Sequence, residues 1–292
     1  VDALSDGKDC VIAGIMEHVE VAGVHSGDSA CCLPAFSLSK NCLEEIRVAT
    51  RSLAKGLSVV GLLNIQFAVK DQVLYVLEVN PRASRTVPFV SKATGIQWAK
   101  AATRVITGRS IAELGLKDSD PKHFSVKEAV LPFKKFTGID PILGPEMKST
   151  GEVMGVDKSF PLAFYKAQIA AGNPLPKEGT VMICHNQDTK GPMVDLGQSF
   201  SHLGFEVSYF NEASQEEDFI KEIEKKETNL LVSIASRSPS PKEAYFRKEA
   251  LLRNVPFITT MKACQASIDA MSKVRQESVS TNTIQSYFTT AR

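Results

Sequence analysis

A carboxylate and three side-chain amides fall on one face of a predicted β-hairpin. Its two strand-like segments, Gly61–Val69 and Val73–Asn80, are joined by a short polar turn. If that turn is centred on Gln72, Gln66 lies directly opposite Glu78, and side chains two residues apart on a strand share a face. The polar face then consists of Asn64, Gln66, Glu78 and Asn80, and the opposite face of Ile65, Phe67, Tyr75, Leu77 and Val79.

The oxygen atoms of the polar face could hold a divalent cation. Directly opposed residues on antiparallel strands have Cβ atoms about 4.5–5.5 Å apart. Mg²⁺ prefers one or two protein carboxylates together with the phosphate oxygens of a nucleotide, and Glu78 with its amide neighbours offers that kind of ligand set. The alternative is that these side chains only form the solvated face that an antiparallel sheet normally has.

Residues that could bind phosphate lie close to this face in the sequence. Arg82 and Arg85 follow Pro81 at the end of the second strand, where guanidinium groups could clamp phosphate or carboxylate oxygens. The glycine-containing stretch Gly23–Asp28 could bring backbone amides close to a phosphate. His25 in this stretch could take part in chemistry, although a single histidine is more often a packed or surface residue.

The composition is that of an ordinary globular protein with about two domains. The 292 residues include 34 Lys and Arg against 33 Asp and Glu, the formal charge is +1, and 43% of the residues are hydrophobic. This balance excludes a disordered chain and a surface that coats nucleic acid. No apolar segment approaches the roughly 20 residues that span a bilayer, so no membrane association is expected.

The cysteines indicate the redox compartment of the protein, and the first residues indicate whether it belongs to a longer chain. The six cysteines include no C-x-x-C pair, so we expect free thiols in a reducing compartment. The segment that begins at Val1 has neither Met nor the features of a signal peptide, which is typical of a cut inside a larger polypeptide.

The second half of the chain alternates short β-branched segments with longer amphipathic ones. The predicted strands are Thr180–Cys184, Glu206–Phe210, Leu230–Ala235 and Phe257–Thr259, and the predicted helices are Gly191–Leu203, Gln215–Lys226, Lys242–Arg253 and Met261–Val274. Four strands that alternate with helices of this length indicate an α/β domain with a parallel sheet and right-handed crossovers.

The first half is predicted to be an α+β domain with antiparallel sheet. Helical spacing covers Leu43–Leu57 and Trp98–Thr107, and Val11–Met16 is predicted to be a further strand.

A stretch rich in Gly and Pro, Ala171–Gly179, separates the two halves and is typical of a domain boundary. We therefore expect domains at 1–173 and 174–292. The Ser- and Thr-rich tail, Ser278–Arg292, is expected to be frayed or loosely docked.

Several long motifs resemble the large subunit of carbamoyl phosphate synthetase, in particular its C-terminal synthetase half. The two most specific motifs are Gly23–Ala30 (GVHSGDSA) and Glu78–Gly95 (EVNPRASRTVPFVSKATG). The similarity continues through Ser125–Glu128, Leu131–Phe133 and Gly144–Gly155. It implies an ATP-grasp lobe in the first domain and a methylglyoxal-synthase-like allosteric domain in the second.

The resemblance also implies roles for individual residues. Gln66, Glu78 and Asn80 match Mg²⁺ or Mn²⁺ ligands, and Gln66 and Glu78 also belong to the nucleotide site. Arg82 matches a residue that contacts the phosphates. The stretch that touches ATP corresponds to Gly23, Val24, His25 and Ser26, with His25 near the reacting phosphate.

Two further sites are implied by the same resemblance. A potassium site made partly of backbone carbonyls corresponds to His18, Val21, Val24 and Ser29. A small-molecule effector site in the second domain corresponds to Asp188, Lys190, Thr259 and Thr260. The family's Gly-Thr element after the second strand is replaced here by Asn211–Ser214, so a purely structural second domain stays an alternative.

In that family the reaction is the ATP-dependent phosphorylation of carbamate to carbamoyl phosphate. The implied cofactors are ATP and Mg²⁺ or Mn²⁺, with K⁺ as a further ion. The implied partners are the remainder of the large chain, a glutaminase subunit or domain and an allosteric effector, in an oligomeric assembly without nucleic acid. We expect a cytoplasmic protein, with mitochondria as the alternative, serving either pyrimidine or arginine synthesis.

Two other functions are compatible with the sequence. The chain could be a regulatory or interaction module without activity, because other residues that hold the nucleotide in this family would precede Val1. It could also be another ATP-grasp ligase, such as a biotin-carboxylase-like enzyme, although Thr86–Lys92 argues against this.

Overall fold

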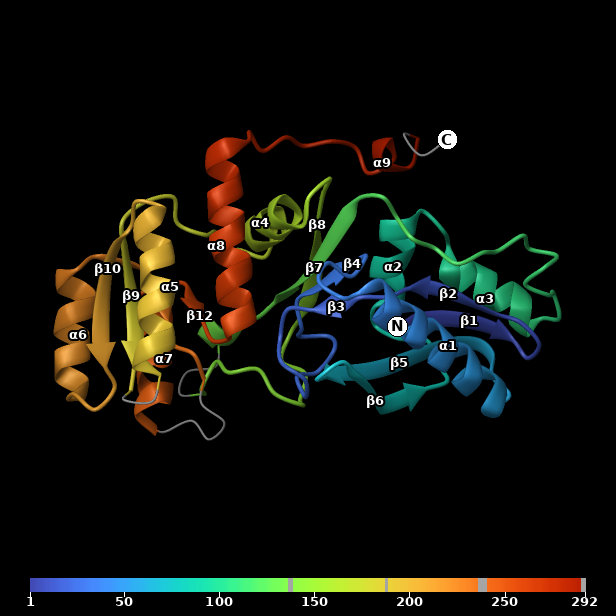
Figure 1. Ribbon diagram of the computed structural model, residues 1–292, viewed down its shortest axis with the longest axis horizontal. Coiled ribbons are helices and arrows are strands. Elements are labelled where there is room, and N and C mark those ends of the chain that lie inside the picture. Colours follow the sequence, from blue (N-terminus) through green and yellow to red (C-terminus); the bar gives the residue numbers. More distant parts are fainter. Residues whose placement is uncertain (136–138, 187–188, 236–240, 290–292) are drawn as a thin grey trace.

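Three four-stranded sheets lie side by side along the long axis of the molecule (Figure 1). The computed structural model describes residues 1–135, 139–186, 189–235 and 241–289. The first two sheets are antiparallel and the third is parallel, which confirms the two predicted sheet types. No helix in the described ranges is long and apolar enough to cross a membrane.

The first sheet has the strand order β2-β1-β5-β6 and is covered on both faces. Its strands are β1 (Asp2–Asp6), β2 (Cys10–Gly14), β5 (Val60–Lys70) and β6 (Val73–Asn80). Helix α1 (Lys40–Gly56) packs on one face, and α2 (Val87–Thr94) with α3 (Trp98–Ile106) packs on the other. Neighbouring residues such as Leu62 and Leu63 point into opposite cores, as the two-residue period of a strand requires.

The hairpin β5–β6 has the predicted register at the polar face and a different register near its turn. Gln66 pairs with Glu78, as expected, but the turn consists of two residues, Asp71 and Gln72, which both have positive φ. A bulge at Leu77 takes up the extra residue. The placement of Tyr75 on the apolar face was therefore wrong, because Tyr75 pairs with Ala68 and shares the face of Gln66.

The second sheet has the order β3-β4-β7-β8 and lies between the other two. Its strands are β3 (Glu17–His18), β4 (Cys31–Leu33), β7 (Phe124–Val130) and β8 (Gly151–Asp157). A short 3₁₀ helix, η1 (Phe133–Lys135), lies between β7 and β8 in the chain. Helix α4 (Phe160–Ala170) packs on β7 and β8 and also on helix α8 (Met261–Gln276), which covers the third sheet. One hydrophobic cluster therefore continues from this sheet into the predicted second domain.

Gly155 on β8 allows α4 to approach the strand. A Cβ atom at this position would stand 2.1 Å from the carbonyl oxygen of Ala163 and 2.5 Å from the backbone nitrogen of Ala167. Because both atoms belong to backbone, Gly155→Ala is expected to lower the free energy of unfolding by about 3 kcal/mol. Urea unfolding measures the loss, and Gly151→Ala on the same strand, which meets no atom within 4 Å, serves as the control. An equal effect of both substitutions would contradict the prediction.

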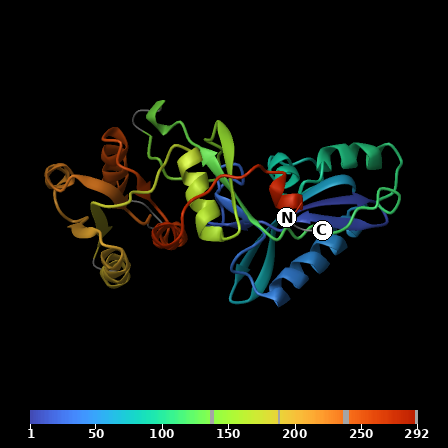
Figure 2. The ribbon, with the colours of Figure 1, turned by 90° about the horizontal axis from the view of Figure 1, so that it is seen from above.

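The third sheet is parallel, with the order β10-β9-β11-β12. Its strands are β9 (Thr180–His185), β10 (Glu206–Asn211), β11 (Thr228–Val232) and β12 (Phe257–Ile258). Its helices are α5 (Lys190–His202), α6 (Glu216–Lys225), α7 (Pro241–Leu252) and α8 (Met261–Gln276). Figure 2 shows the sheet between two helix layers, α5 with α8 and α6 with α7. These elements match the predicted ones within a few residues.

The last described residues run back from α8 to the first sheet and end in helix α9 (Ser286–Thr289) (Figure 1). The ring of Phe288 packs on Gly95 after α2, and the Tyr287 hydroxyl donates to the carbonyl oxygen of Val156 at 3.2 Å. Both rings lie beside His123, with ring centroids 5.2 and 5.7 Å away. This segment is docked through specific contacts. The six cysteines are unpaired, as predicted.

Candidate functional site

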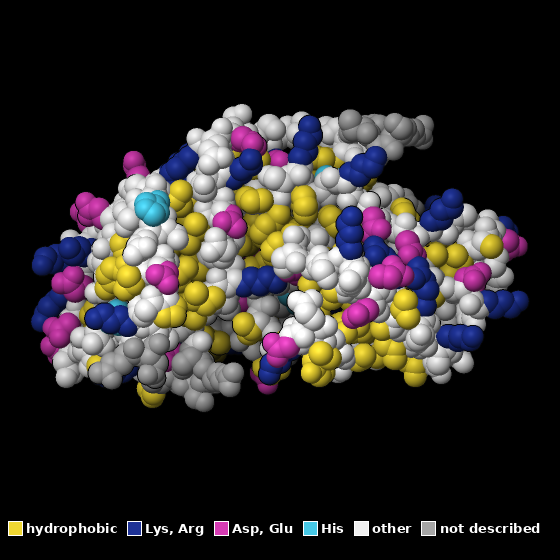
Figure 3. Space-filling view, viewed as in Figure 1, with side chains coloured by type: hydrophobic (Ala, Val, Ile, Leu, Met, Phe, Trp, Pro, Cys, Tyr) yellow, Lys and Arg dark blue, Asp and Glu magenta, His cyan; other side chains and the backbone are white. Residues whose placement is uncertain are grey.

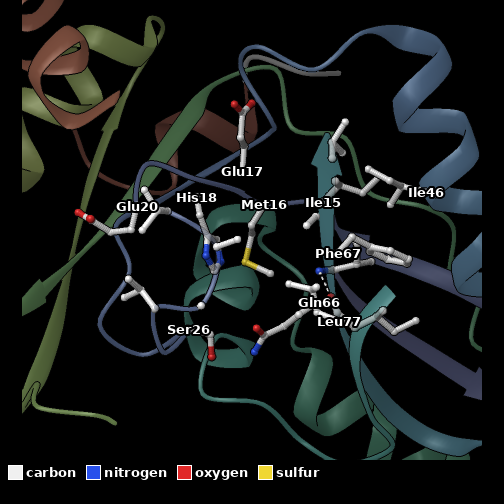
Figure 4. A pocket seen from close by; sticks show the side chains of 18 of the residues that line it. Ile15, Met16, Glu17, His18, Glu20, Ser26, Ile46, Gln66, Phe67 and Leu77 are labelled. Atoms are coloured by element: carbon white, nitrogen blue, oxygen red, sulfur yellow. Dashed lines mark hydrogen bonds between the residues drawn. The ribbon is translucent and has the colours of Figure 1, made fainter. Parts of the chain in front are cut away.

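A cavity of about 270 Å³ opens between the loop that follows β3 and the strand β5. Four of the predicted nucleotide-contacting residues line it: Gly23, Val24, Ser26 and Gln66. Figure 4 shows Ser26, His18 and Met16 facing Gln66 across this space. The structure thus brings together two segments that are about forty residues apart in the sequence. The predicted residues His25, Glu78, Asn80 and Arg82 do not line this cavity.

The proposed metal ligands share one face of the hairpin. Glu78 lies directly across from Gln66, and Asn80 lies across from Asn64, so all four side chains project to the same side. Glu78 is exposed, and Asn80 accepts a hydrogen bond through Oδ1 from Nη2 of Arg82 at 3.3 Å. One carboxylate, two amide oxygens and a guanidinium group therefore stand at the open end of the hairpin.

A buried polar network fixes the segment that carries these residues. Asp2 on β1 is 2% exposed, and its carboxylate accepts hydrogen bonds from Asn64 at 2.7 Å, Ser84 at 2.8 Å and Thr86 at 2.6 Å. These bonds tie the turn that follows β6 to the central strands. Asn64 thus has a structural role through its Nδ2, and the metal ligands that the family resemblance implies remain Gln66, Glu78 and Asn80.

The glycine-containing loop is held by groups from two other sequence motifs. The carboxylate of Asp28, which is 1% exposed, accepts from the backbone nitrogens of Lys148 at 2.7 Å and Ser149 at 3.0 Å. The fully buried Lys127 donates to the carbonyl oxygen of Gly27 at 3.0 Å. The backbone nitrogen of His25 donates to the carbonyl oxygen of Gly144 at 2.8 Å. The motifs Gly23–Ala30, Ser125–Glu128 and Gly144–Gly155 are therefore one packed unit.

His25 is held inside this loop. Its Nδ1 accepts a hydrogen bond from the backbone nitrogen of Gly27 at 3.0 Å, so the ring is oriented by its own turn. Of the residues that match the potassium site, His18, Val21 and Val24 line the cavity, and Ser29 is buried and donates to the carbonyl oxygen of His25 at 3.2 Å. Burial lowers the pKa of His18 to about 4, so the ring is neutral near pH 7.

The carboxyl group of Glu20, which lines the cavity, lies close to that of the buried Glu128 on β7. Burial, together with the neighbouring Glu20 carboxyl, raises the pKa of Glu128 to about 7. Burial likewise raises the pKa of Glu20 to about 7. The Glu128 carboxyl accepts a hydrogen bond from Nε2 of Gln168 at 2.6 Å. The folded protein therefore keeps protons on this pair at pH values where the unfolded chain loses them.

Glu128→Gln is expected to remove part of the pH dependence of stability. In the wild type, the contribution of a carboxyl with a raised pKa is present below pH 4.5 and is lost as the pH rises through about 7. At about 1.4 kcal/mol per pKa unit, the wild type is expected to lose roughly 2–3 kcal/mol of its free energy of unfolding between pH 4.5 and pH 8 through this group. The Glu128→Gln variant has no carboxyl at this position and is expected to lack this loss. Urea unfolding of both proteins across this range measures the difference. Parallel curves for variant and wild type would contradict it.

The residues that match the effector site follow two different strands at the carboxyl-terminal edge of the parallel sheet. Lys190 is the first residue of α5, beyond β9, and is exposed, whereas Thr259 and Thr260 lie between β12 and α8. The strand β11 separates these two places, which at about 4.8 Å per strand puts them roughly 10 Å apart. The Thr260 side chain caps α8 by accepting from the backbone nitrogen of Ala263. Asp188 lies outside the described residues.

Comparison with known proteins adds direct evidence on the family. The family described as carbamoyl-phosphate synthase L chain, ATP binding domain, matches residues 1–114. The carbamoyl phosphate synthase large chain of Rhodopirellula baltica is 47% identical, over 98% of this chain and 28% of its own length. The chain is homologous to carbamoyl phosphate synthase large chains. The resemblance noted in the motifs is therefore confirmed along nearly the whole chain, including the parallel-sheet half.

Other relatives give the same result. The large chain of Archaeoglobus fulgidus is 47% identical over 98% of this chain and 29% of its own length. A protein of Aquifex aeolicus named carbamoyl phosphate synthase large chain, C-terminal section, is 43% identical over 94% of this chain and 58% of its own length. The chain thus spans less than a third of the full large chains. Among solved structures, a biotin carboxylase domain of a single-chain bacterial carboxylase covers 58% of this chain and 45% of its own, with a TM-score of 0.45 and 17% identity.

Several residues that shape the site were missed from the sequence. Asp2 and Asp28 are buried acids whose partners lie far along the chain, so no local pattern marks them. Glu17 on β3 and Lys262 on α8 line the cavity from the two halves of the chain. In the part of the chain that the structure describes, no group of three or more His, Cys, Asp or Glu side chains is placed to hold a metal. A metal at the hairpin would depend on amide and phosphate oxygens in addition to Glu78.

Proposed function

We propose that this chain forms the metal- and phosphate-binding lobe of an ATP-grasp synthetase that phosphorylates carbamate to carbamoyl phosphate. The pairing of Gln66 with Glu78 carries the proposal, because it puts a carboxylate and an amide oxygen at cross-strand distance beside the cavity. Homology to carbamoyl phosphate synthase large chains supports the choice of reaction.

The donor set fits a hard divalent cation. Gln66, Glu78 and Asn80 supply only oxygen ligands, as Mg²⁺ and Mn²⁺ prefer, and the small number of carboxylates leaves positions for phosphate oxygens. When bound, the cation would neutralise the phosphate charge that builds up during transfer. The Asp2 network keeps the hairpin and the Asn80–Thr86 turn in place, so the ligands are positioned before any metal arrives.

The remaining residues have positioning and electrostatic roles. Arg82 stands beside Asn80, and its guanidinium group would pair with phosphate oxygens in place of its present contacts with Asn80 and Ala83. The loop of Gly23, Val24, His25 and Ser26 would hold the nucleotide at the cavity, and its three anchors would keep it rigid. Positioning of carbamate in line with the γ-phosphoryl group, with water excluded, then accounts for the chemistry.

The same homology is the basis on which we propose partners and a further ion for this chain. The exposure of Glu78 and Arg82 leaves one side of the site open, which favours closure by another part of a large chain. A glutaminase partner, K⁺ at the loop of His18, Val21, Val24 and Ser29, and an effector near Lys190, Thr259 and Thr260 belong to this proposal.

Binding of Mn²⁺ and ATP by the chain tests the proposal. The relaxation rate of water protons reports Mn²⁺ that becomes immobilised on a protein, and it detects weak complexes. We expect the enhancement to appear only when Mn²⁺, ATP and the chain are all present. Its absence would favour the other function, a regulatory module without a nucleotide site of its own.

A further inference from the structure

A side chain from the parallel-sheet half reaches the cavity of the first half. Lys262 lies in the first turn of α8, and its Nζ donates to Oε1 of Glu17 at 2.7 Å and to the carbonyl oxygen of His18 at 2.9 Å. Lys262 lines the same cavity as Gly23 and Gln66. One wall of the candidate nucleotide site is thus completed by a residue that is 245 positions from its ion-pair partner.

The acceptor of this bond is itself held rigidly. Glu17 is 6% exposed, and its other oxygen accepts from the backbone nitrogens of Phe36 at 2.9 Å and Ser37 at 2.8 Å. The Ser37 hydroxyl donates to the same oxygen as Lys262. The ammonium group also lies over the Phe36 ring, 5.1 Å from its centroid. The ion pair therefore joins α8 to a fixed point on the first half.

The strand that carries Glu17 leads directly into the glycine-containing loop. Strand β3 has only two residues, so it has few backbone hydrogen bonds to β4. Side-chain contacts therefore contribute much of what keeps β3 in position. The residues Gly23, Val24 and Ser26 follow within nine positions. On the other side, Thr260 caps α8 two residues before Lys262. A displacement of the first turn of α8 can therefore act on the loop through the Lys262 side chain.

We propose that Lys262 is a positioning residue for this loop, through which the parallel-sheet half sets the affinity of the cavity for a metal-bound nucleoside triphosphate. The proposal rests on the proposed function in its choice of ligand. The link between Lys262 and the loop does not depend on that choice, so the two parts are tested separately.

Amide hydrogen exchange of residues 18–29 tests the link without any nucleotide. Lys262→Met keeps the length of the side chain and removes the charge, and it is expected to speed exchange in this segment by roughly tenfold. Lys262→Arg is expected to restore slow exchange, because a guanidinium group can still donate to Glu17. Lys273→Met on the same helix, which removes an ion pair with Glu277 away from the cavity, is the matched control and is expected to exchange as the wild type does.

The affinity for Mn²⁺ and ATP tests the positioning role. Lys262→Met is expected to weaken it about three- to tenfold, with recovery in Lys262→Arg and no change in Lys273→Met. Unchanged exchange in Lys262→Met, or faster exchange with unchanged affinity, would overturn the proposal. If the wild type binds no nucleotide, the proposed function fails for this chain, while the exchange data still decide whether Lys262 holds the loop.

Discussion

Glu78→Gln is expected to weaken metal-dependent nucleotide binding at least roughly tenfold. Glu78 is the one carboxylate among the proposed hairpin ligands, and a neutral amide in its place removes the charge that a divalent cation needs at this position. The variant keeps the size of the side chain, and Glu78 is exposed, so the fold is expected to be retained. We expect at least a roughly tenfold loss of affinity for Mn²⁺ in the presence of ATP.

The measurement is the relaxation enhancement of water protons by Mn²⁺ with and without ATP. Glu152→Gln is the matched control, because Glu152 is also an exposed strand carboxylate but lies on β8, away from the cavity. It is expected to bind as the wild type does. Equal binding by the Glu78→Gln variant and the wild type would show that the hairpin face is only solvated surface.

Arg247→Met is expected to lower the free energy of unfolding by about 3 kcal/mol. Arg247 on α7 is fully buried, and its guanidinium group makes two hydrogen bonds, of 2.9 and 2.7 Å, to the carboxylate of Asp140. Glu243 lies 3.6 Å from the same group. Removal of the guanidinium group leaves the carboxylates of Asp140 and Glu243 without this cation in a largely desolvated environment. Breaking a buried ion pair by removing one partner typically costs 3–5 kcal/mol. We take the lower end because the Asp140 side chain is 27% exposed.

Urea unfolding of single and double variants checks this prediction. Arg253→Met removes pairs with Glu224 and Glu249 nearer the surface and is expected to cost about 1 kcal/mol or less. Adding Asp140→Asn to Arg247→Met is expected to recover part of the loss, because the isolated carboxylate is then neutral. A loss in Arg247→Met no larger than in Arg253→Met would contradict the prediction.

The hairpin and the parallel half could be predicted because their signals are local. Polar residues at Gln66 and Glu78 face each other in the expected register, although the two-residue turn and the bulge at Leu77 could not be read from the pattern. The two errors in the expected hairpin, a longer turn and no bulge, cancelled at the polar face. They did not cancel at Tyr75, which lies nearer the turn.

Other elements gave no periodic signal. Helix α4 is buried on several sides, against β7, β8 and α8, so its apolar residues form no single stripe. Strand β1 carries the buried polar residues Asp2 and Ser5, whose partners come from distant segments. The contacts of Asp28 and Lys262 join segments more than one hundred residues apart, and only the folded chain brings them together.

The bidentate contact between Arg247 and Asp140 has a consequence for ligands of the parallel sheet. Nη1 of Arg247 also reaches Ser233 just after β11, between the places of Lys190 and Thr259. An anion that binds this guanidinium group must therefore displace the Asp140 carboxylate. Its observed affinity is then lower than its intrinsic affinity by the fraction of molecules in which Asp140 has released Arg247. Asp140 lies four residues before Gly144, whose carbonyl binds the backbone of His25. The contact of Arg247 with Asp140 therefore holds one end of the short segment that anchors the glycine-containing loop.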